Sequence, residues 1–380
     1  MIATDELSAW LRLLETPGVG RTTARKLLAA FGSPQAVWAA PRGARAAVVG
    51  PVVADALGTE PPGCAELVAA TVAWLTDPAA DGQRHVITLG DNAYPNALLS
   101  QADPPLLLYA HGRLALLQAQ AIAVVGSRHA TAQGLDNARA FAAHLSQAGL
   151  TVVSGLALGV DGAAHEGALT GPGSTIAVVG TGLDRVYPSR HRNLTHRIAR
   201  EGLLLSEFPI GTEPLAAHFP QRNRIIAGLS LGTLVVEAAV QSGSLITARM
   251  ALEGGREVFA IPGSIHAPQS RGCHALIRQG AKLVECGQDI LEELQLSARP
   301  GPVDPADAER EGLSDEADAS QGGPHAALLY ALGLDPVSLD ALAARTGWPT
   351  SQLNIELLDL ELQGQVARLP GQLFQRRMAG

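Results

Sequence analysis

Residues 121–128 read AIAVVGSR, an apolar run that ends in Gly126-Ser127-Arg128. A helical pattern then extends to about Ala148, and a second apolar run, Thr151–Val153, follows it. A continuous apolar run bounded by turn residues is typical of a strand that is buried on both faces. The stretch therefore predicts a strand, a tight turn, and a helix that leads back to a second, parallel strand.

The same alternation continues over residues 84–296. Further strands are predicted at Thr175–Val179, Leu203–Leu205, Thr233–Val236 and Val258–Ile261. Segments of helical length separate them. Alternating strands and helices indicate a parallel sheet covered on both faces, so we expect an α/β domain with an extended Rossmann-like, doubly wound sheet.

Helical modules are predicted on both sides of this domain. Residues 1–80 form a helical region in which Thr16–Gly20 (TPGVG) joins two short helices, so it resembles a helix-hairpin-helix, or SAM-like, domain that holds DNA phosphates. Residues 325–380 read as two helices and a hairpin, which is typical of a winged helix. Its second helix, Thr350–Gln363, has three acids and no Lys or Arg, which favours protein contacts over reading of duplex DNA.

The charge of the chain is unevenly distributed. The formal net charge is −8, but seven acids and one Arg between Gly301 and Pro324 account for −6 of it. We expect residues 297–324 to be an acidic, disordered linker, because they carry few large apolar side chains. The rest of the chain is close to neutral and can still present a basic face.

Several classes of protein are excluded by composition and motif. Cys64, Cys273 and Cys286 show no metal-ligand spacing, and no apolar run is long enough to span a membrane. With Lys only at Lys26 and Lys282 and no G-x-x-x-x-G-K-[ST] motif, a P-loop ATPase is excluded. We expect a soluble, cytoplasmic protein with no metal, no cofactor and no membrane contact.

The loops after the strands carry the candidate ligand site. In an open α/β sheet, ligands lie beyond the carboxyl ends of the strands, where small residues and helix N-termini favour anions. The candidate binding residues are Gly126, Ser127, Arg128, Ser154, Gly155, Gly180, Gly182, Arg190, Arg192, Arg222, Asn223, Arg224, Ser242, Gly243 and Ser244. Together they predict a site for several phosphates.

Two features allow more than one interpretation. Arg222 and Arg224 lie at the positive end of a predicted helix, which is unfavourable unless Glu207, Glu237 or a DNA phosphate is near. Asp161 and His165 share one face of a predicted helix. Helix capping and a local hydrogen bond explain this second pair better than an acid–base dyad or part of a metal site, because no adjacent nucleophile and no third ligand are evident.

Taken together, these motifs resemble the DNA-processing protein A family (DprA, also called Smf). The matching runs are IAVVGSR (122–128), SGLALGVDGAAHEGAL (154–169), TIAVVGTGLDRVYP (175–188), LSEFPIGTEP (205–214), FPQRNRIIAGLS (219–230), VVEAAVQSGSLITA (235–248), REVFAIPGSI (256–265) and GCHALIRQGA (272–281). The chain departs from the family pattern at Gln133, where Tyr is usual, and at His191, where Asn is usual.

The resemblance implies a function without catalytic turnover. A member would bind and protect incoming single-stranded DNA, form a homodimer through its Rossmann-like domain, and load the RecA recombinase during natural transformation. The Gly126–Arg128 loop and the basic residues beside it would hold the DNA.

Two alternatives remain open at this point. Leu231–Glu237 is similar to a run in lysine-decarboxylase-like nucleotide hydrolases, although the Pro-Gly-Gly that precedes that run is absent here. In this alternative the chain acts on a nucleotide-derived small molecule, and Glu237 is the catalytic residue. A purely structural scaffold would dimerise and bind partners without affinity for DNA. The acidic linker could also fold back and compete with DNA for the basic face.

Overall fold

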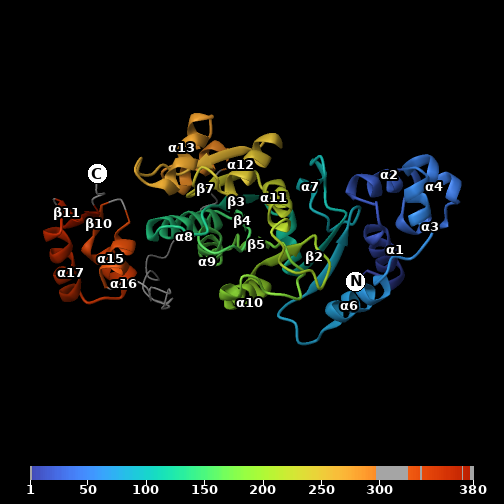
Figure 1. The fold of residues 1–380 in the computed structure, drawn as a ribbon, viewed down its shortest axis with the longest axis horizontal. Coiled ribbons are helices and arrows are strands. Elements are labelled where there is room, and N and C mark those ends of the chain that lie inside the picture. Colours follow the sequence, from blue (N-terminus) through green and yellow to red (C-terminus); the bar gives the residue numbers. More distant parts are fainter. Residues whose placement is uncertain (1, 297–323, 334–335, 370, 377–380) are drawn as a thin grey trace.

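The computed structural model describes residues 2–296, 324–333, 336–369 and 371–376. Three parts follow one another along the long axis of the molecule (Figure 1). Helices of the N-terminal module lie at one end, the α/β domain lies in the centre, and a small helical module with a wing lies at the other end.

A nine-stranded sheet forms the centre of the molecule, in the order β1-β2-β6-β5-β4-β3-β7-β8-β9. The strands are β1 (Arg84–Thr88), β2 (Leu107–Gly112), β3 (Ala121–Val125), β4 (Thr151–Ser154), β5 (Thr175–Val178), β6 (Leu203–Ser206), β7 (Gly232–Val235), β8 (Glu257–Ala260) and β9 (Lys282–Leu283). Strands β3 to β8 lie where the sequence predicts them, to within one residue at each end. This confirms the predicted fold class.

The sheet is mostly parallel rather than wholly parallel. β1 pairs antiparallel with β2, and β2 pairs antiparallel with β6. These two strands extend the sheet toward the N-terminal helices, where Val86, Leu107 and Tyr109 pack in one core with Trp10 and Trp74. The extension therefore supplies the surface on which the helical module is seated.

Helices cover both faces of the sheet because the side chains of each strand alternate between them. Ile122 and Val124 of β3 face α8 (Ala132–Gln147), α9 (Val160–Ala168) and α14 (Gly287–Glu293). Ala123 and Val125 face α11 (His218–Leu229), α12 (Ser244–Glu253) and α13 (Arg271–Arg278). Burial on both sides explains why β3 reads as an uninterrupted apolar run.

The direction in which the chain winds reverses at β3. After β3 it proceeds outward through β4, β5 and β6, and it then returns to place β7 on the other side of β3. The carboxyl ends of β3 and β7 therefore form the topological switch point, the place where doubly wound sheets bind their ligands.

The N-terminal module consists of six helices. They are α1 (Thr4–Glu15), α2 (Arg21–Phe31), α3 (Pro34–Ala39), α4 (Arg42–Val49), α5 (Pro51–Ala56) and α6 (Cys64–Thr76). The predicted Thr16–Gly20 turn joins α1 to α2, and Gly18 adopts a φ of +80° there. A side chain at Gly18 would also approach Val53 of α5, so the turn between α1 and α2 packs on α5.

The C-terminal module has the predicted winged-helix arrangement. Its elements are α15 (Pro324–Leu332), β10 (Val337–Ser338), α16 (Leu339–Thr346), α17 (Thr350–Leu362), β11 (Val366–Leu369) and β12 (Leu373–Arg376). The Ser338 hydroxyl caps α16 by accepting a hydrogen bond of 3.2 Å from the Ala341 amide. α15 and α16 lie toward α8, and α17 lies on the far side of the module (Figure 1).

The predicted acidic linker lies outside the described residues, apart from Pro324, which begins α15. In the part of the chain that the structure describes, no helix is long and apolar enough to cross a membrane.

Candidate nucleic-acid interface

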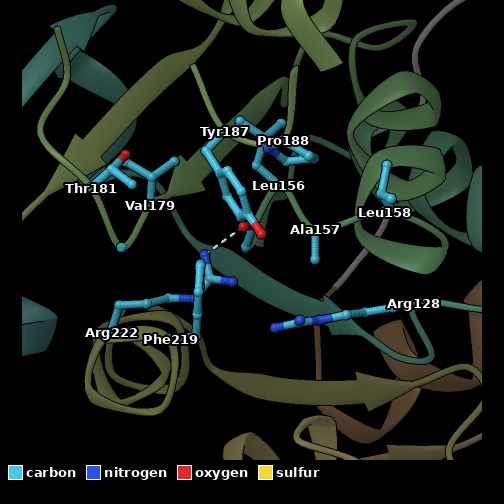
Figure 2. Close-up of a pocket in the computed structure, with 12 residues that line it drawn as sticks. Arg128, Leu156, Ala157, Leu158, Val179, Thr181, Tyr187, Pro188, Phe219 and Arg222 are labelled. Atoms are coloured by element: carbon cyan, nitrogen blue, oxygen red, sulfur yellow. Dashed lines mark hydrogen bonds between the residues drawn. The ribbon is translucent and has the colours of Figure 1, made fainter. Parts of the chain in front are cut away.

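A pocket opens at the carboxyl ends of β3, β4 and β5. It is lined by Arg128, Gly155, Leu156, Ala157, Leu158, Val179, Gly180, Thr181, Tyr187, Pro188, Phe219 and Arg222. Figure 2 shows the side chains of Arg128, Arg222 and Tyr187 directed toward its centre. Four of the predicted residues, Arg128, Gly155, Gly180 and Arg222, therefore meet in one place.

Arg222 lies under the pocket and is buried. It extends from the first turns of α11, and its Nη1 donates to the carbonyl oxygens of Gly155 and Val178 at the ends of β4 and β5. A Cβ at Gly155 would lie 2.2 Å from Nη2 of Arg222, so glycine is needed there. Burial lowers the pKa of Arg222 to about 10, and the nearby Asp161 opposes that shift, so Arg222 stays charged at neutral pH.

Asp161 and His165 support the loop that follows β4. Asp161 Oδ2 accepts hydrogen bonds from the amides of Gly155 and Ala157, at 3.1 and 3.3 Å. His165 Nε2 accepts from the Leu156 amide at 3.2 Å, and Nδ1 lies 2.7 Å from Oγ1 of Thr175. Burial raises the pKa of Asp161 and lowers that of His165 to about 3, so the imidazole is neutral. The pair acts as a scaffold for the pocket wall.

Arg128 is exposed and lies beside two aromatic rings. Its guanidinium carbon is 5.3 Å from the centre of the Phe219 ring, and the centres of the Phe219 and Tyr187 rings are 5.6 Å apart. The sequence does not predict this aromatic pair, because Tyr187 lies in the loop before α10 and Phe219 lies far along the chain, at the start of α11. Their only sequence signal was their place beside the basic runs 189–192 and 222–224.

The basic run after Pro188 is anchored next to the same loop. Ser189–His191 form a 3-10 turn, and α10 (Arg192–Glu201) follows it. His191 Nδ1 lies 3.1 Å from the carbonyl oxygen of Leu156, which holds the turn against the end of β4. The side chains of Arg190 and Arg192 are exposed at this position.

The Gly126–Arg128 loop lies at the switch point. A Cβ at Gly126 would come within 2.6 Å of Val160, so only glycine allows α9 to approach β3 this closely. The Ser127 hydroxyl accepts from the His129 amide at 3.1 Å. Glu237, at the end of β7, accepts hydrogen bonds from the amide and hydroxyl of Thr131 at 3.0 and 2.5 Å. Glu237 therefore fixes the start of α8.

The second predicted loop, Ser242–Ser244, lies beside α11. The hydroxyls of Ser242 and Ser244 are 2.7 Å apart, and Ser244 begins α12. Asn223 Nδ2 donates to the Gly243 carbonyl at 3.5 Å, and Asn223 Oδ1 accepts from Arg222 Nε at 3.1 Å. Asn223 thus links this loop to the buried arginine.

Ser154, Gly182 and Arg224 are predicted site residues that the structure engages elsewhere in the fold. Ser154 is buried in the sheet, and its hydroxyl donates to the Val124 carbonyl at 2.7 Å. Gly182 is closely packed, because a Cβ there would lie 2.4 Å from the Asp184 carboxylate. Arg224 is directed away, toward the N-terminal module.

Arg224 belongs to a network that joins the two modules. It pairs with Glu207, and its Nη1 donates to the Asp103 carbonyl at 2.6 Å. Arg21 of the N-terminal hairpin also pairs with Glu207, at 3.2 Å, and with the Asp103 carboxylate, at 2.6 Å. Glu207, one of the two carboxylates that the sequence offered, is therefore the partner of Arg224. The carboxylate that favours the charged form of Arg222 is Asp161, which the sequence did not indicate for this role.

The described part of the chain contains no cluster of three or more His, Cys, Asp or Glu residues that could hold a metal ion.

Comparison with known proteins identifies the family of this chain. The family model described as "DNA recombination-mediator protein A" matches residues 85–295, more than half of the sequence. The chain belongs to the DNA recombination-mediator protein A family. Two further models match the flanking modules: a "DprA-like N-terminal HHH domain" over residues 4–56 and a "DprA winged helix domain" over residues 313–372. The resemblance noted in the sequence is confirmed.

Relatives of the same family share extensive sequence with the chain. Protein Smf of Escherichia coli is 43% identical over 82% of this chain and 82% of its own length. DNA processing protein DprA of Streptococcus pneumoniae is 51% identical over 54% of this chain and 72% of its own length.

Two solved structures share the fold. That of DNA processing protein A from S. pneumoniae has a TM-score of 0.65 at 39% identity and covers 77% of this chain and 98% of its own. That of DNA processing protein A from Helicobacter pylori has a TM-score of 0.52 at 30% identity and covers 56% of this chain and 96% of its own. The H. pylori structure is described as showing a single-stranded DNA binding mode.

Proposed function

We propose that this chain binds single-stranded DNA across the carboxyl ends of β3, β4 and β5. The observation that carries the proposal is the position of Arg128, which is exposed at the switch point beside the Tyr187–Phe219 ring pair and above the buried charge of Arg222. A cation next to aromatic faces is the combination that single-strand binding requires: the cation meets a phosphate and the rings stack on bases.

The two parts of the site have different roles in this proposal. Arg128 and the exposed Arg192 lie where they can meet backbone phosphates. Tyr187 is 43% exposed, so its ring has a face that an unpaired base can cover. Stacking of this kind tolerates any base, so we expect binding with little dependence on sequence.

We further propose that the chain is not an enzyme. Glu237, the residue that would act in a nucleotide hydrolase, has hydrogen bonds to the start of α8. His165 is buried, and its neutral imidazole is engaged with the Leu156 amide and the Thr175 hydroxyl. Both side chains therefore have structural partners that account for their presence, which supports a binding role for the site.

The remaining expectations from the resemblance also belong to this proposal. We propose that the chain acts in the cytoplasm, where it protects incoming single strands and loads RecA during natural transformation. We also propose that it forms a homodimer through its Rossmann-like domain. An open sheet edge at β9, where Leu283 is 44% exposed, supports a dimer through this domain. Loading requires the bound strand to remain accessible, which a pocket open at the carboxyl ends of the strands would allow.

The proposed binding is tested by fluorescence anisotropy of a labelled single-stranded oligonucleotide, titrated at several salt concentrations with unlabelled duplex as competitor. We expect preference for the single strand and a steep loss of affinity with salt. Absence of binding at low salt would overturn the proposal and would direct attention to small nucleotides.

Substitution of Tyr187 separates stacking from charge. Tyr187→Ala should weaken single-strand binding by about 1–3 kcal/mol, the usual value of one stacked base, and should leave the salt slope unchanged. Tyr187→Phe is the matched control, because it keeps the ring and should bind like the wild type. If Tyr187→Ala and Tyr187→Phe bound the single strand equally well, the ring of Tyr187 would not contribute to binding.

A further inference from the structure

The outward face of α17 carries an apolar stripe that nothing in the chain's DNA-binding site uses. Ile355, Leu358 and Leu362 are 69%, 57% and 79% exposed. They are spaced three and four residues apart, so they lie in one row along the helix. Leu353, Leu357 and Leu360 of the same helix are buried in the core of the module, so the exposed row is additional to the apolar face that folding requires.

Apolar side chains exposed in a continuous row are unusual on a protein surface. Single exposed leucines need no explanation, but a contiguous patch marks a site of interaction. The spacing of Ile355, Leu358 and Leu362 is the one by which helices meet a partner in helix-in-groove or helix-on-helix recognition. α15 and α16 lie toward α8, so α17 is left on the outer side of the molecule (Figure 1).

The charges around the row indicate what kind of partner fits. α17 contains Glu356, Asp359 and Glu361 and has no Lys or Arg. Asp359 follows Leu358 and Glu361 precedes Leu362, so the helix turn places one carboxylate on each side of the row. A partner that covers the row would therefore place its own flanking residues against carboxylates, and Lys or Arg at those places would be favoured.

The same charges disfavour the other occupants. Duplex DNA would bring phosphates against a helix that has three acids and no cation, in the position where winged-helix proteins carry their reading residues. A second copy of α17 would bring like charges together along the row.

We propose that the row Ile355, Leu358 and Leu362 is a docking surface for a basic amphipathic helix of another protein. Apolar residues of that helix would cover the row, and a Lys or Arg side chain would pair with the exposed Glu361. A second cation would share the Asp359 carboxylate with His325, whose Nε2 lies 3.0 Å from it. The surface is separate from the DNA pocket, so the proposal stands independently of single-strand binding.

The test uses the full-length chain and two labelled synthetic helical peptides. Both carry leucines at the i, i+3 and i+7 positions; one has Lys and Arg beside them, and the other has Glu at the same places. Binding is measured by fluorescence anisotropy at physiological salt. We expect the basic peptide to bind and the acidic peptide to fail, because only the first complements α17.

Matched variants show whether the peptide is held by the row. Leu358→Lys should lower the affinity for the basic peptide by about tenfold or more, since it removes an apolar anchor and adds a positive charge that repels the peptide. Ile355→Ser should weaken it less, because it removes only apolar area. Val52→Lys is the control: Val52 is 81% exposed on α5, far from the row, and its substitution should leave binding unchanged. Circular dichroism checks that each variant is folded.

Several results would overturn the proposal. The first is that the acidic peptide binds as tightly as the basic one, and the second is that the basic peptide does not bind. The third is that Leu358→Lys binds the basic peptide with the affinity of the wild type. Loss of duplex binding in Leu358→Lys would assign the row to DNA. Loss of a dimer in that variant, seen by analytical ultracentrifugation, would assign it to a second copy of the chain. Single-strand affinity should be the same in wild type and Leu358→Lys, so failure here is distinguishable from failure of the DNA site.

Discussion

The N-terminal hairpin and the loop after β3 look alike in sequence but differ in what surrounds their arginines. Both place a basic residue after a glycine turn: Arg21 is the first residue of α2, and Arg128 lies a few residues before α8. Arg21 pairs with Asp103 and Glu207, whereas Arg128 is exposed beside the Phe219 ring. A basic residue after a glycine turn therefore indicates a phosphate site only where the fold brings no carboxylate to meet it.

The two regions therefore have different roles, one in docking the modules and the other in binding the ligand. The arginines of the hairpin hold the N-terminal module against the α/β domain, and Arg25 adds a hydrogen bond of 2.7 Å to the Ala102 carbonyl. The loop after β3 is held by backbone and by Glu237, which leaves the Arg128 guanidinium at the surface. Substitutions in one region should then affect assembly of the modules, and substitutions in the other should affect ligand binding.

The largest loss of stability is expected at Arg222, which lines the pocket and also bonds to the strand ends beneath it. Arg222→Met removes the donors to two buried carbonyls and leaves Asp161 without its cation. Breaking a buried pair of this kind costs about 3–5 kcal/mol, so the free energy of unfolding in urea should fall by that amount. Single-strand affinity should fall with it.

The exposed Arg192 provides the control for this substitution. Arg192→Ala removes the same charge from the surface and should change the free energy of unfolding by less than about 0.5 kcal/mol. If Arg222→Met were as stable as Arg192→Ala, Arg222 would be a ligand-binding residue only and not a structural one.

Glu207 gives the next largest effect, and it tests the hairpin side of the comparison. Glu207→Gln leaves Arg21 and Arg224 without their shared carboxylate in a site where the Arg224 and Glu207 side chains are each 13% exposed. We expect a loss of about 2–3 kcal/mol in the free energy of unfolding. Limited proteolysis should release the N-terminal module sooner.

The DNA site should not respond to the same substitution. Single-strand affinity of Glu207→Gln should equal that of wild type, because the network lies away from the pocket. A large loss of affinity would contradict the division of roles between Arg224 and Arg128.

A smaller effect is expected from His165 and depends on pH. Its pKa in the folded chain is about 3, below its ordinary value of 6.5. Below pH 6.5 the unfolded chain takes up a proton that the folded chain does not, so stability falls as the pH drops from 6.5 toward 3. This should amount to about 2 kcal/mol at pH 5, at about 1.4 kcal/mol for each unit of pH.

The contribution of His165 is isolated by substitution. His165→Gln should be less stable than wild type at pH 7, and its free energy of unfolding should change less between pH 7 and pH 5. Parallel curves for the two proteins in urea titrations at both pH values would show that His165 does not titrate as described.

The sequence predicts the parts of the fold that are encoded locally. Strands β3 to β8 are each uninterrupted apolar runs that end at a turn residue, because both of their faces are buried, so pattern alone locates them. The winged helix is also encoded locally, in two helical segments joined by a short turn and followed by a hairpin with a Pro-Gly turn. Strands β1 and β2 were missed, because their burial depends on helices from a different module.

The site shows where prediction from sequence stops. Arg128 was found because it follows β3 directly at the switch point. The partner of Arg224 could not be decided, since Glu207, Glu237 and a phosphate were all compatible with its position. Asp103 was not considered at all, because its loop meets Arg21 only after the modules have docked. The Tyr187–Phe219 pair was missed because neither ring has a sequence neighbour that predicts the other.

The most direct test compares Arg128→Ala with Arg21→Ala in single-strand binding at several salt concentrations. For Arg128→Ala the account predicts about tenfold weaker binding and a salt slope that is smaller by about one, as expected when one phosphate contact is lost. For Arg21→Ala it predicts the affinity and slope of wild type. The reverse pattern, with Arg21→Ala weakened and Arg128→Ala unchanged, would place the DNA on the N-terminal hairpin and contradict the account.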